Sequence, residues 1–220
     1  LGFAEANRID LIIMGTQGAT GIRKTIIGTV AAKIAEQADI PILLIPGKYD
    51  WKDPKHIVFA SNYSKSDKDA LHTLLSIARL FKSRVTVLHL RNTYLSAVEK
   101  EKAQADFDAY AFALQRDFNE DKIKFSLLDT DSVTETMENL DKKMPYDIIG
   151  MVRRKKGFYE KFFIGSFTKN MAYITKQPLL IIPEQTTANG KNKKYGKEET
   201  LLMPHKSKLK IEKLSKKKQL

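Results

Sequence analysis

Cysteine is absent from this chain of 220 residues, and histidine occurs only four times. Without cysteine the chain can form no disulfide bond, no thiolate metal site and no cysteine nucleophile. No two histidines stand at the spacing of metal ligands, so we expect no metal site. His89 ends an apolar run and is expected to be a hydrogen-bonded core residue. A G-x-S-x-G motif is also missing, and we predict no catalytic residues and no enzyme.

Long apolar runs are missing as well. Segments such as Leu11–Met14 and Ile42–Ile45 are far shorter than the roughly 18 residues that a membrane span needs. The first residues do not have the composition of a signal peptide. We therefore expect a cytoplasmic protein with no membrane partner.

The positive charge is concentrated near the C-terminus. Of the net charge of +12, residues 184–220 contribute +7 through 11 Lys and 4 Glu. This segment has too few apolar residues to offset the entropy of ordering it, so we predict a disordered tail. Lysine tails are usually solvated, and we favour that interpretation over a nucleic-acid partner, which stays the alternative.

An internal repeat organises the rest of the sequence. When the chain is shifted by 137 residues without a gap, residues 10–46 fall on residues 147–183. Three pairs of segments match in this register: Asp10–Met14 with Asp147–Met151, Gly28–Thr29 with Gly165–Ser166, and Pro41–Pro46 with Pro178–Pro183. Three matches in one register indicate two copies of one unit.

Apolar periodicity predicts alternating strands and helices in the second copy. The strands expected there are Ile57–Ser61, Val85–Leu90, Ile123–Leu128, Asp147–Val152 and Leu179–Ile182, and the helices are a stripe from Ala70 to Phe81, a stripe from Tyr94 to Phe118, Val133–Leu140 and Ser166–Thr175. The first copy has a strand at Asp10–Met14, a helix at Val30–Gln37 and a strand at Ile42–Ile45. This alternation is typical of an α/β fold with a parallel sheet covered on both faces.

The repeat also predicts how the chain is divided. We expect residues 1–47 to be the C-terminal part of a first domain, 48–54 a linker, 55–183 a complete second domain and 184–220 the tail. The first strand of the second copy begins near His56, so a first copy of the same size would have roughly 80 further residues upstream. We therefore expect the first domain to be truncated. Trp51, in the linker, is expected to pack against a domain.

A glycine-rich loop carries the chemistry of the first copy. The strand Asp10–Met14 runs into the segment Gly15–Gly21, and Gly28–Thr29 comes directly before the helix Val30–Gln37. Glycines let a ligand approach the backbone closely, and a helix N-terminus favours an anion. The loop follows neither the Walker A nor the G-x-G-x-x-G pattern.

The spacing Gly-x2-Gly-x9-Gly-Ser/Thr after a strand resembles the ATP-binding motif of the universal stress protein family, and the resemblance extends over residues 1–183. It implies that backbone amides of the loop and the Thr29 hydroxyl hold the triphosphate, with Met14 and Val30 bordering the site. The cofactor-binding residues implied are thus Met14, Gly15, Gly18, Gly28, Thr29 and Val30, and the cofactor implied is ATP.

The family resemblance also implies a fold and a function. The fold is a doubly wound, five-stranded parallel sheet in the order 3-2-1-4-5, here as one complete domain plus the C-terminal part of a preceding copy. The function implied for the intact protein is that of an ATP-binding stress-response regulator; slow hydrolysis is compatible with it but not indicated. The alternative is an interaction module that binds no nucleotide.

The second copy departs from the motif. Val152 and Lys155 stand where the first copy has Gly15 and Gly18, and Asn62 stands where the family has an acidic residue after its first strand. We therefore expect a degenerate second site. The basic residues that follow Val152 could attract an anion, but we favour a solvated loop.

Two prolines suggest how the copies assemble. Pro41 and Pro178 begin the matching final strands, where a missing N–H is tolerated at a sheet edge. An exposed apolar edge strand needs a partner. We predict that Ile42–Ile45 pairs with Leu179–Ile182 in a pseudo-dimer of the two copies, as in dimers of the family, and a homodimer is a further assembly that we leave open.

Overall fold

The computed structural model describes the chain except for residues 8, 17–28, 65, 119–121, 155–175 and 185–220. The predicted helix at 166–175 and the predicted disordered tail lie outside the described residues. The described helices and strands are, in chain order, α1 (Gly2–Ala6), β1 (Ile12–Gly15), α2 (Thr29–Gln37), β2 (Ile42–Ile45), β3 (His56–Ala60), α3 (Asp67–Phe81), β4 (Arg84–Asn92), α4 (Ala97–Phe118), β5 (Ile123–Thr130), α5 (Val133–Glu138), α6 (Leu140–Lys143), β6 (Ile148–Arg153) and β7 (Leu179–Pro183).

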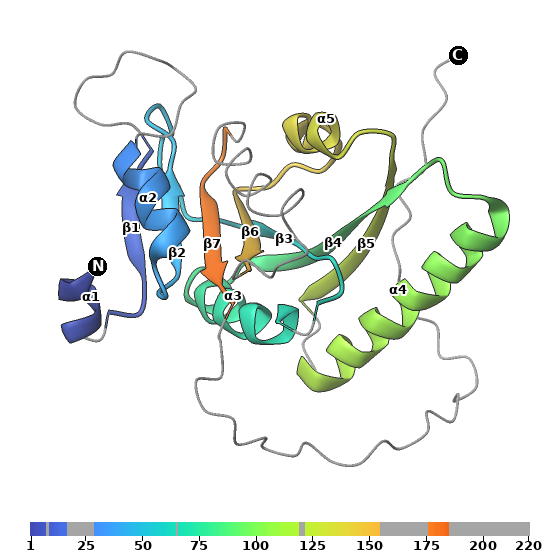
Figure 1. Cartoon of the computed structure of the whole chain (residues 1–220), viewed down its shortest axis with the longest axis horizontal. Helices are drawn as coiled ribbons and strands as arrows, with labels where there is room; N and C mark the ends of the chain where they lie inside the picture. The colour runs from blue at the N-terminus through green and yellow to red at the C-terminus, as the bar shows by residue number, and fades with distance from the viewer. Residues whose placement is uncertain (8, 17–28, 65, 119–121, 155–175, 185–220) are drawn as a thin grey trace.

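The strands form one seven-stranded sheet in the order β1-β2-β7-β6-β3-β4-β5 (Figure 1). The strands of residues 56–183 follow one another as β5-β4-β3-β6-β7, which is the order 3-2-1-4-5. All neighbouring strands are parallel except β2 and β7. The α/β class is therefore confirmed, but the sheet has seven strands and not five, because β2 and β1 continue it beyond β7.

The predicted pairing of the two final strands is confirmed. β2 and β7 run antiparallel, with Ile42 opposite Ile181 and Leu44 opposite Leu179. Both strands are almost entirely buried. Apolar edges that would otherwise face water are thus paired with each other, which is one way proteins avoid aggregation through sheet edges.

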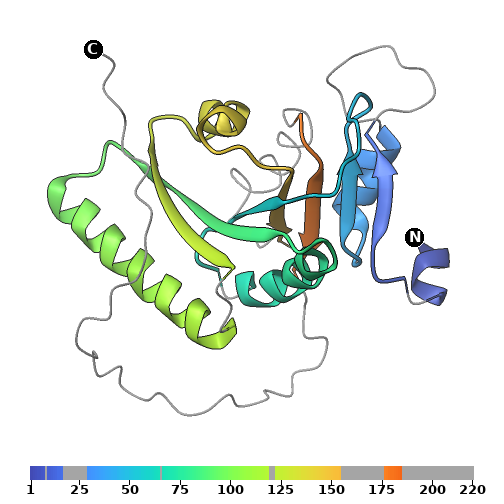
Figure 2. The same cartoon turned by 180° about the vertical axis from the view of Figure 1, so that it is seen from behind.

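Helices cover both faces of the sheet, and Figure 2 shows the arrangement from behind. Buried residues of α3 and α4 form one cluster with the sheet, and residues of α2, α5 and α6 form a second cluster on the opposite side. The alternation of side chains along a strand explains this division: Phe59 of β3 belongs to the first cluster and Val58 to the second.

The periodicity of α3 gives its buried face correctly. Five of the residues predicted to form its apolar stripe are buried: Ala70, Leu71, Leu74, Leu75 and Ala78. The sixth, Phe81, is only partly buried. The helix ends at Phe81. The capping residue Lys82 takes a left-handed conformation, and its N–H donates back to carbonyl oxygens of the last turn. Phe81 packs edge-to-face against Trp51 with ring centroids 6.3 Å apart, so the predicted packing of the linker tryptophan is confirmed.

Two helix predictions are wrong in detail. Tyr94 and Val98 were expected on the core-facing stripe of α4, but both are exposed. Tyr94 lies before the helix, which begins at Ala97. The C-terminal half of α4 packs on the core, where Phe107, Ala111 and Leu114 are buried and Phe118 packs against the first cluster. The helix predicted at Val133–Leu140 is instead two short helices, α5 and α6, separated by Asn139.

No helix in the described part of the chain is both long and apolar enough to cross a membrane.

Candidate functional site

The carboxyl end of β1 carries the described part of the predicted phosphate loop. Gly15 is the last residue of β1 and lies opposite Ile45 of β2. The N–H of Thr16 continues the ladder by donating to the carbonyl oxygen of Ile45, at 2.9 Å. Met14 is partly buried against the second cluster. The backbone of Gly15 is thereby fixed at the point where the loop begins.

The helix that follows the loop starts at the same end of the sheet. α2 begins at Thr29, and Figure 1 shows its first turn near the carboxyl end of β1. Val30 is exposed there. Gly18 and Gly28 lie outside the described residues, as does the side chain of Thr29. The described residues thus bring together Met14, Gly15 and the N-terminus of a nine-residue helix, where backbone N–H groups favour an anion.

The corresponding loop of the second copy has a different arrangement. Arg153, at the end of β6, donates to the carbonyl oxygens of Glu36 and Ala38 at the end of α2, at 2.8 Å for Glu36. Arg154 donates to the side-chain oxygen of Asn62, which follows β3. The prediction of a solvated basic loop is therefore wrong for Arg153. Helix C-termini attract cations, and the guanidinium of Arg153 binds at the C-terminus of α2. Lys155 and Lys156 lie outside the described residues.

A buried carboxylate, not predicted from the sequence, lies close to Asn62. Asp67 begins α3, is 1% exposed and accepts hydrogen bonds from the hydroxyls of Ser61, Ser64 and Tyr110, with Ser61 at 2.5 Å. Three hydroxyl donors and the positive end of α3 can hold this charge without a cation. The sequence signal for this site is limited to residues 64–67, of which Ser64, Ser66 and Asp67 are types that often cap helices. It did not indicate Ser61 or Tyr110.

Aromatic side chains close the adjacent space between β4 and α4. Tyr63 has a φ of 63° and its ring stacks on His89, with centroids 3.9 Å apart. The Nδ1 atom of His89 lies 2.9 Å from the carbonyl oxygen of Ser61, and burial lowers the pKa of His89. His89 is thus a hydrogen-bonded, largely buried histidine, as predicted. Tyr110 packs against the same tyrosine, and its burial, with Asp67 nearby, raises its pKa.

The universal stress protein family matches residues 1–46 and 54–183 of this sequence. The chain belongs to the universal stress protein family. A universal stress protein of Methanocaldococcus jannaschii is 42% identical over 43 residues, which are 20% of this chain and 25% of that protein.

Solved structures share the fold of this universal stress protein. A protein of unknown function from Pseudomonas aeruginosa PAO1 superposes with a TM-score of 0.62 and 15% identity over 83% of the chain. A universal stress protein from Archaeoglobus fulgidus gives a TM-score of 0.62 and 12% identity over 84% of the chain. The chain spans 66% of the length of each. A universal stress protein in complex with cAMP is also similar, with a TM-score of 0.44 and 14% identity over 61% of this chain and 100% of that one.

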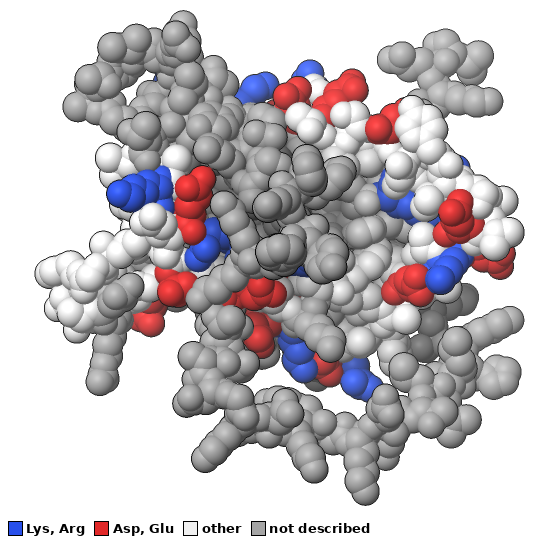
Figure 3. Space-filling model, in the orientation of Figure 1, with Lys and Arg blue, Asp and Glu red and all other residues white. Residues whose placement is uncertain are grey.

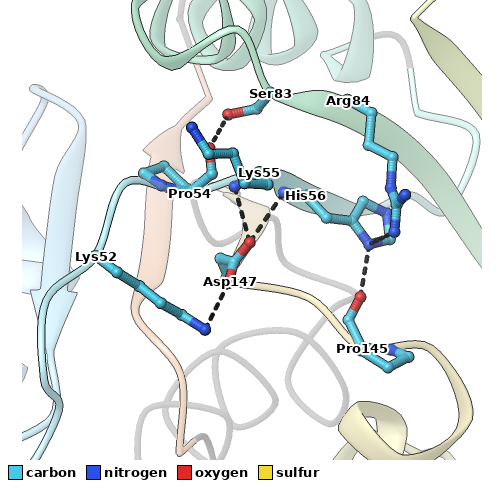
Figure 4. A network of polar contacts seen from close by, with 8 residues as sticks. All are labelled: Lys52, Pro54, Lys55, His56, Ser83, Arg84, Pro145 and Asp147. Carbon is cyan, nitrogen blue, oxygen red and sulfur yellow. Dashed lines mark hydrogen bonds and ion pairs between the residues drawn. The ribbon is translucent and has the colours of Figure 1, made fainter.

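The amino ends of β3 and β6 hold a structural polar network (Figure 4). The carboxylate of Asp147 accepts from the backbone N–H groups of Lys55 and His56 at 2.8 and 3.0 Å, and Lys52 lies 3.4 Å away. Partial burial acts to raise the pKa of Asp147, but these donors outweigh it and the pKa lies below the usual value. His56 is buried between Pro145 and Thr86. These groups lie at the amino ends of β3 and β6, at the other end of these strands from Asn62 and Arg154. Because β2 runs antiparallel to β7, β1 ends at this same edge of the sheet, but β2 and β7 lie between β1 and the network.

On the face of the molecule shown in Figure 3, the described acidic and basic side chains are interspersed. No group of three or more His, Asp or Glu side chains that could hold a metal ion occurs among the described residues. The net positive charge of the chain therefore does not form a single-sign patch over the described residues of that view.

Proposed function

We propose that the intact protein is an ATP-binding stress-response regulator, acting in the cytoplasm, whose first copy holds the nucleotide. The observation that carries the proposal is the position of Gly15. It ends β1 beside the first turn of α2, and the loop of the matching motif, with Gly18 and Gly28, connects the two. Glycine leaves the backbone accessible to phosphate oxygens, and the helix N-terminus adds N–H donors. Met14, Thr29 and Val30 complete the proposed site.

The second copy binds no nucleotide in this proposal. Val152 carries a Cβ where the first copy has Gly15. In addition, the guanidinium of Arg154 bonds to Asn62, across the point where the sheet order reverses between β3 and β6. Ligands of open α/β sheets bind at this switch point. An arginine that already spans it competes with a nucleoside for the same groups.

The protein would act by binding and not by catalysis. ATP would change which partner or conformation is preferred, and hydrolysis would be slow if it occurs. An interaction module without nucleotide is the second candidate, and the pairing of β2 with β7 favours it. That pairing gives the two copies a shared sheet without any ligand.

The test compares phosphate and nucleotide binding at the two loops. Backbone amide shifts are followed by NMR while tripolyphosphate, and separately ATP, is added to wild type, to Gly15→Val and to the control Val152→Leu. Wild type and the control are expected to shift at Gly15 and in the first turn of α2, and Gly15→Val is not. Calorimetry on the intact protein should give one ATP per chain. Equal shifts in the Gly15→Val variant, or two equivalent sites, contradict the proposal.

A further inference from the structure

The long helix α4, which packs beside β5 (Figure 1), has apolar residues on two opposite sides. One side packs on the first cluster through Phe107, Ala111 and Leu114, which are buried. On the other side, Val98 is 77% exposed and Phe112 is 36% exposed. The side of a surface helix that faces away from the core is usually polar. The exposed side of α4 is therefore a candidate contact surface.

This exposed side has the spacing of a coiled-coil seam. Its residues follow one another at alternating steps of four and three, and all of them are exposed: Val98, Lys102, Ala105, Ala109, Phe112 and Arg116. We call this series the α4 seam. It has the spacing at which one helix contacts another in a coiled coil. Because Lys102 and Arg116 interrupt it, its continuous apolar part is short and fits a short partner helix.

The charges beside the α4 seam select a basic partner. In a coiled coil, the residues that flank the seam face the flanks of the partner helix and determine which partner is accepted. The flanking residues of α4 include four acids and no base: Glu99, Glu101, Asp106, Asp108, Ala113 and Gln115. A second α4 would bring acids against acids, whereas a helix with lysines at its flanking positions would be attracted.

The C-terminal segment of the same chain has the complementary pattern. It contains a series at steps of four, three and four: Ser207, Ile211, Leu214 and Lys218. The residues that would flank this series in a helix are three lysines and a serine: Lys208, Lys210, Lys217 and Ser215. At the period of a helix, Leu209 and Glu212 fall on the other side, and Glu212 is the only acid of residues 207–218.

From these two patterns we infer that residues 207–218 dock as a helix on the α4 seam of the same molecule. The tail contains too few apolar residues to order by itself, which is why the sequence predicts disorder for it. The α4 seam supplies the apolar surface that the tail lacks, so this segment can order on contact. The docking needs no nucleotide and is independent of the proposed function.

The charges also favour one orientation of the docked segment. In an antiparallel pair, Leu214 lies on Ala109, whose small side chain leaves room for it. A parallel pair with Ile211 on Ala109 would instead place Lys218 against Arg116, which are like charges. We therefore expect the antiparallel arrangement.

The chain is long enough for this contact. β7, which precedes the tail, is four strand spacings from β5 in the sheet, a distance of roughly 19 Å. A flexible chain as long as residues 185–206 has a root-mean-square end-to-end distance of roughly 26 Å. A tether of this length gives an effective concentration on the order of millimolar, so even a weak contact between the helices is sufficient.

Disulfide cross-linking tests the contact directly, because the chain has no cysteine of its own. The variant Ala109→Cys/Leu214→Cys places two thiols at the inferred contact, and a disulfide forms only when the two Cα atoms come within about 7 Å. The matched control Ala109→Cys/Leu209→Cys places the second thiol on the far side of the docked segment. Under mild oxidation, the intramolecular disulfide should form at least about ten-fold faster in the first variant than in the control. Equal rates overturn the inference.

The single variant Ala109→Cys tests the other occupant. A disulfide-linked dimer that forms in this variant as fast as the intramolecular bond would show that a second copy of α4 covers the seam, and it overturns the inference. We expect such a dimer to form no faster than in a variant with the thiol elsewhere on the surface, Glu138→Cys on α5.

A further comparison tests the selection by charge. Asp108, which lies beside Lys217 in the antiparallel pair, is changed to lysine in the cross-linking variant. The control is Glu138→Lys, an exposed acid on α5, which packs on the other face of the sheet. At low salt, Asp108→Lys should slow cross-linking by at least about three-fold relative to this control, and the difference should disappear at about 1 M salt, where charges are screened. Equal rates at low salt overturn the inference.

Discussion

Leu43 of β2 lies directly opposite Leu180 of β7, the residue 137 positions later in the chain. On either side of this pair, each residue of β2 faces the repeat counterpart of the other: Ile42 faces Ile181, and Leu44 faces Leu179. In the repeat, Ile42 corresponds to Leu179 and Leu44 to Ile181. An exchange of this kind is what an approximate two-fold axis through the pair requires.

The Leu43–Leu180 pair should contribute strongly to stability. Both side chains are buried in the first cluster, so replacing either by alanine should lower the free energy of unfolding by about 2–4 kcal/mol. Because the two residues are cross-strand neighbours, the double variant should differ from the sum of the single ones by about 0.5 kcal/mol or more. Urea denaturation of the four proteins checks both expectations. Additive losses would mean that the two side chains do not interact across the β2–β7 pair.

Arg153 also links the two copies, and its removal should have a local cost. Arg153→Ala takes away the donor to the carbonyl oxygens of Glu36 and Ala38, and should lower the free energy of unfolding by about 1–2 kcal/mol. Amide exchange should rise in the last turn of α2. The control is Arg116→Ala, because the Arg116 side chain is mostly exposed and surface ion pairs contribute little. A loss in Arg153→Ala no larger than in this control would contradict the assigned role.

The sequence predicted the elements of this fold better than the side-chain contacts between them. Periodicity identified the buried face of α3, because that face is encoded by spacing along the chain. The pairing of β2 with β7 was predicted from the two matching prolines and from the resemblance to dimers of the family. The sequence did not predict that Arg153 reaches the end of α2, 117 residues away in sequence. It missed Asp67 as a buried carboxylate because the hydroxyls that hold it come from the loop after β3 and from α4. Contacts of this kind depend on tertiary structure, which local pattern does not determine.

Gly150 should be required for stability, because α3 packs directly against it through Leu74. A Cβ there would lie 2.6 Å from the Cδ1 atom of Leu74, so Gly150→Ala should cost about 1–3 kcal/mol of stability. Leu74→Ala alone should also be destabilising, because it leaves a cavity. The two together should be less destabilising than their sum, since the smaller side chain admits the new methyl group. Thermal unfolding of the single and double variants measures this, and Gly2→Ala is the control because nothing lies within 4 Å of its Cβ position. A fully additive double variant would rule out the contact.

Acid should destabilise the protein in two separate ranges of pH. Burial, with Arg84 nearby, lowers the pKa of His56, and burial lowers that of His89. Both histidines therefore bind protons more readily in the unfolded chain, and stability should fall as the pH drops below about 6.5, by up to about 1.4 kcal/mol per pH unit for each. Asp147 has a lowered pKa, so the stability that it contributes is present above about 3.8 and is lost only as the pH falls further toward its folded value.

The contribution of His56 can be separated from a general loss of stability. In the neutral ring Nδ1 donates to the carbonyl oxygen of Pro145 at 2.7 Å, and Nε2 accepts from the Thr86 hydroxyl at 2.8 Å. His56→Gln should be less stable at pH 7.5 and should lose less stability than wild type between pH 6.5 and 5.5, because one of the two titrating groups is gone. Ser83→Ala is the matched control: it removes a buried hydrogen bond to Pro54 but no titrating group, so it should lower stability equally at every pH. Urea denaturation at each pH gives the slopes, and an unchanged slope in His56→Gln would show that protonation of His56 does not drive the acid loss.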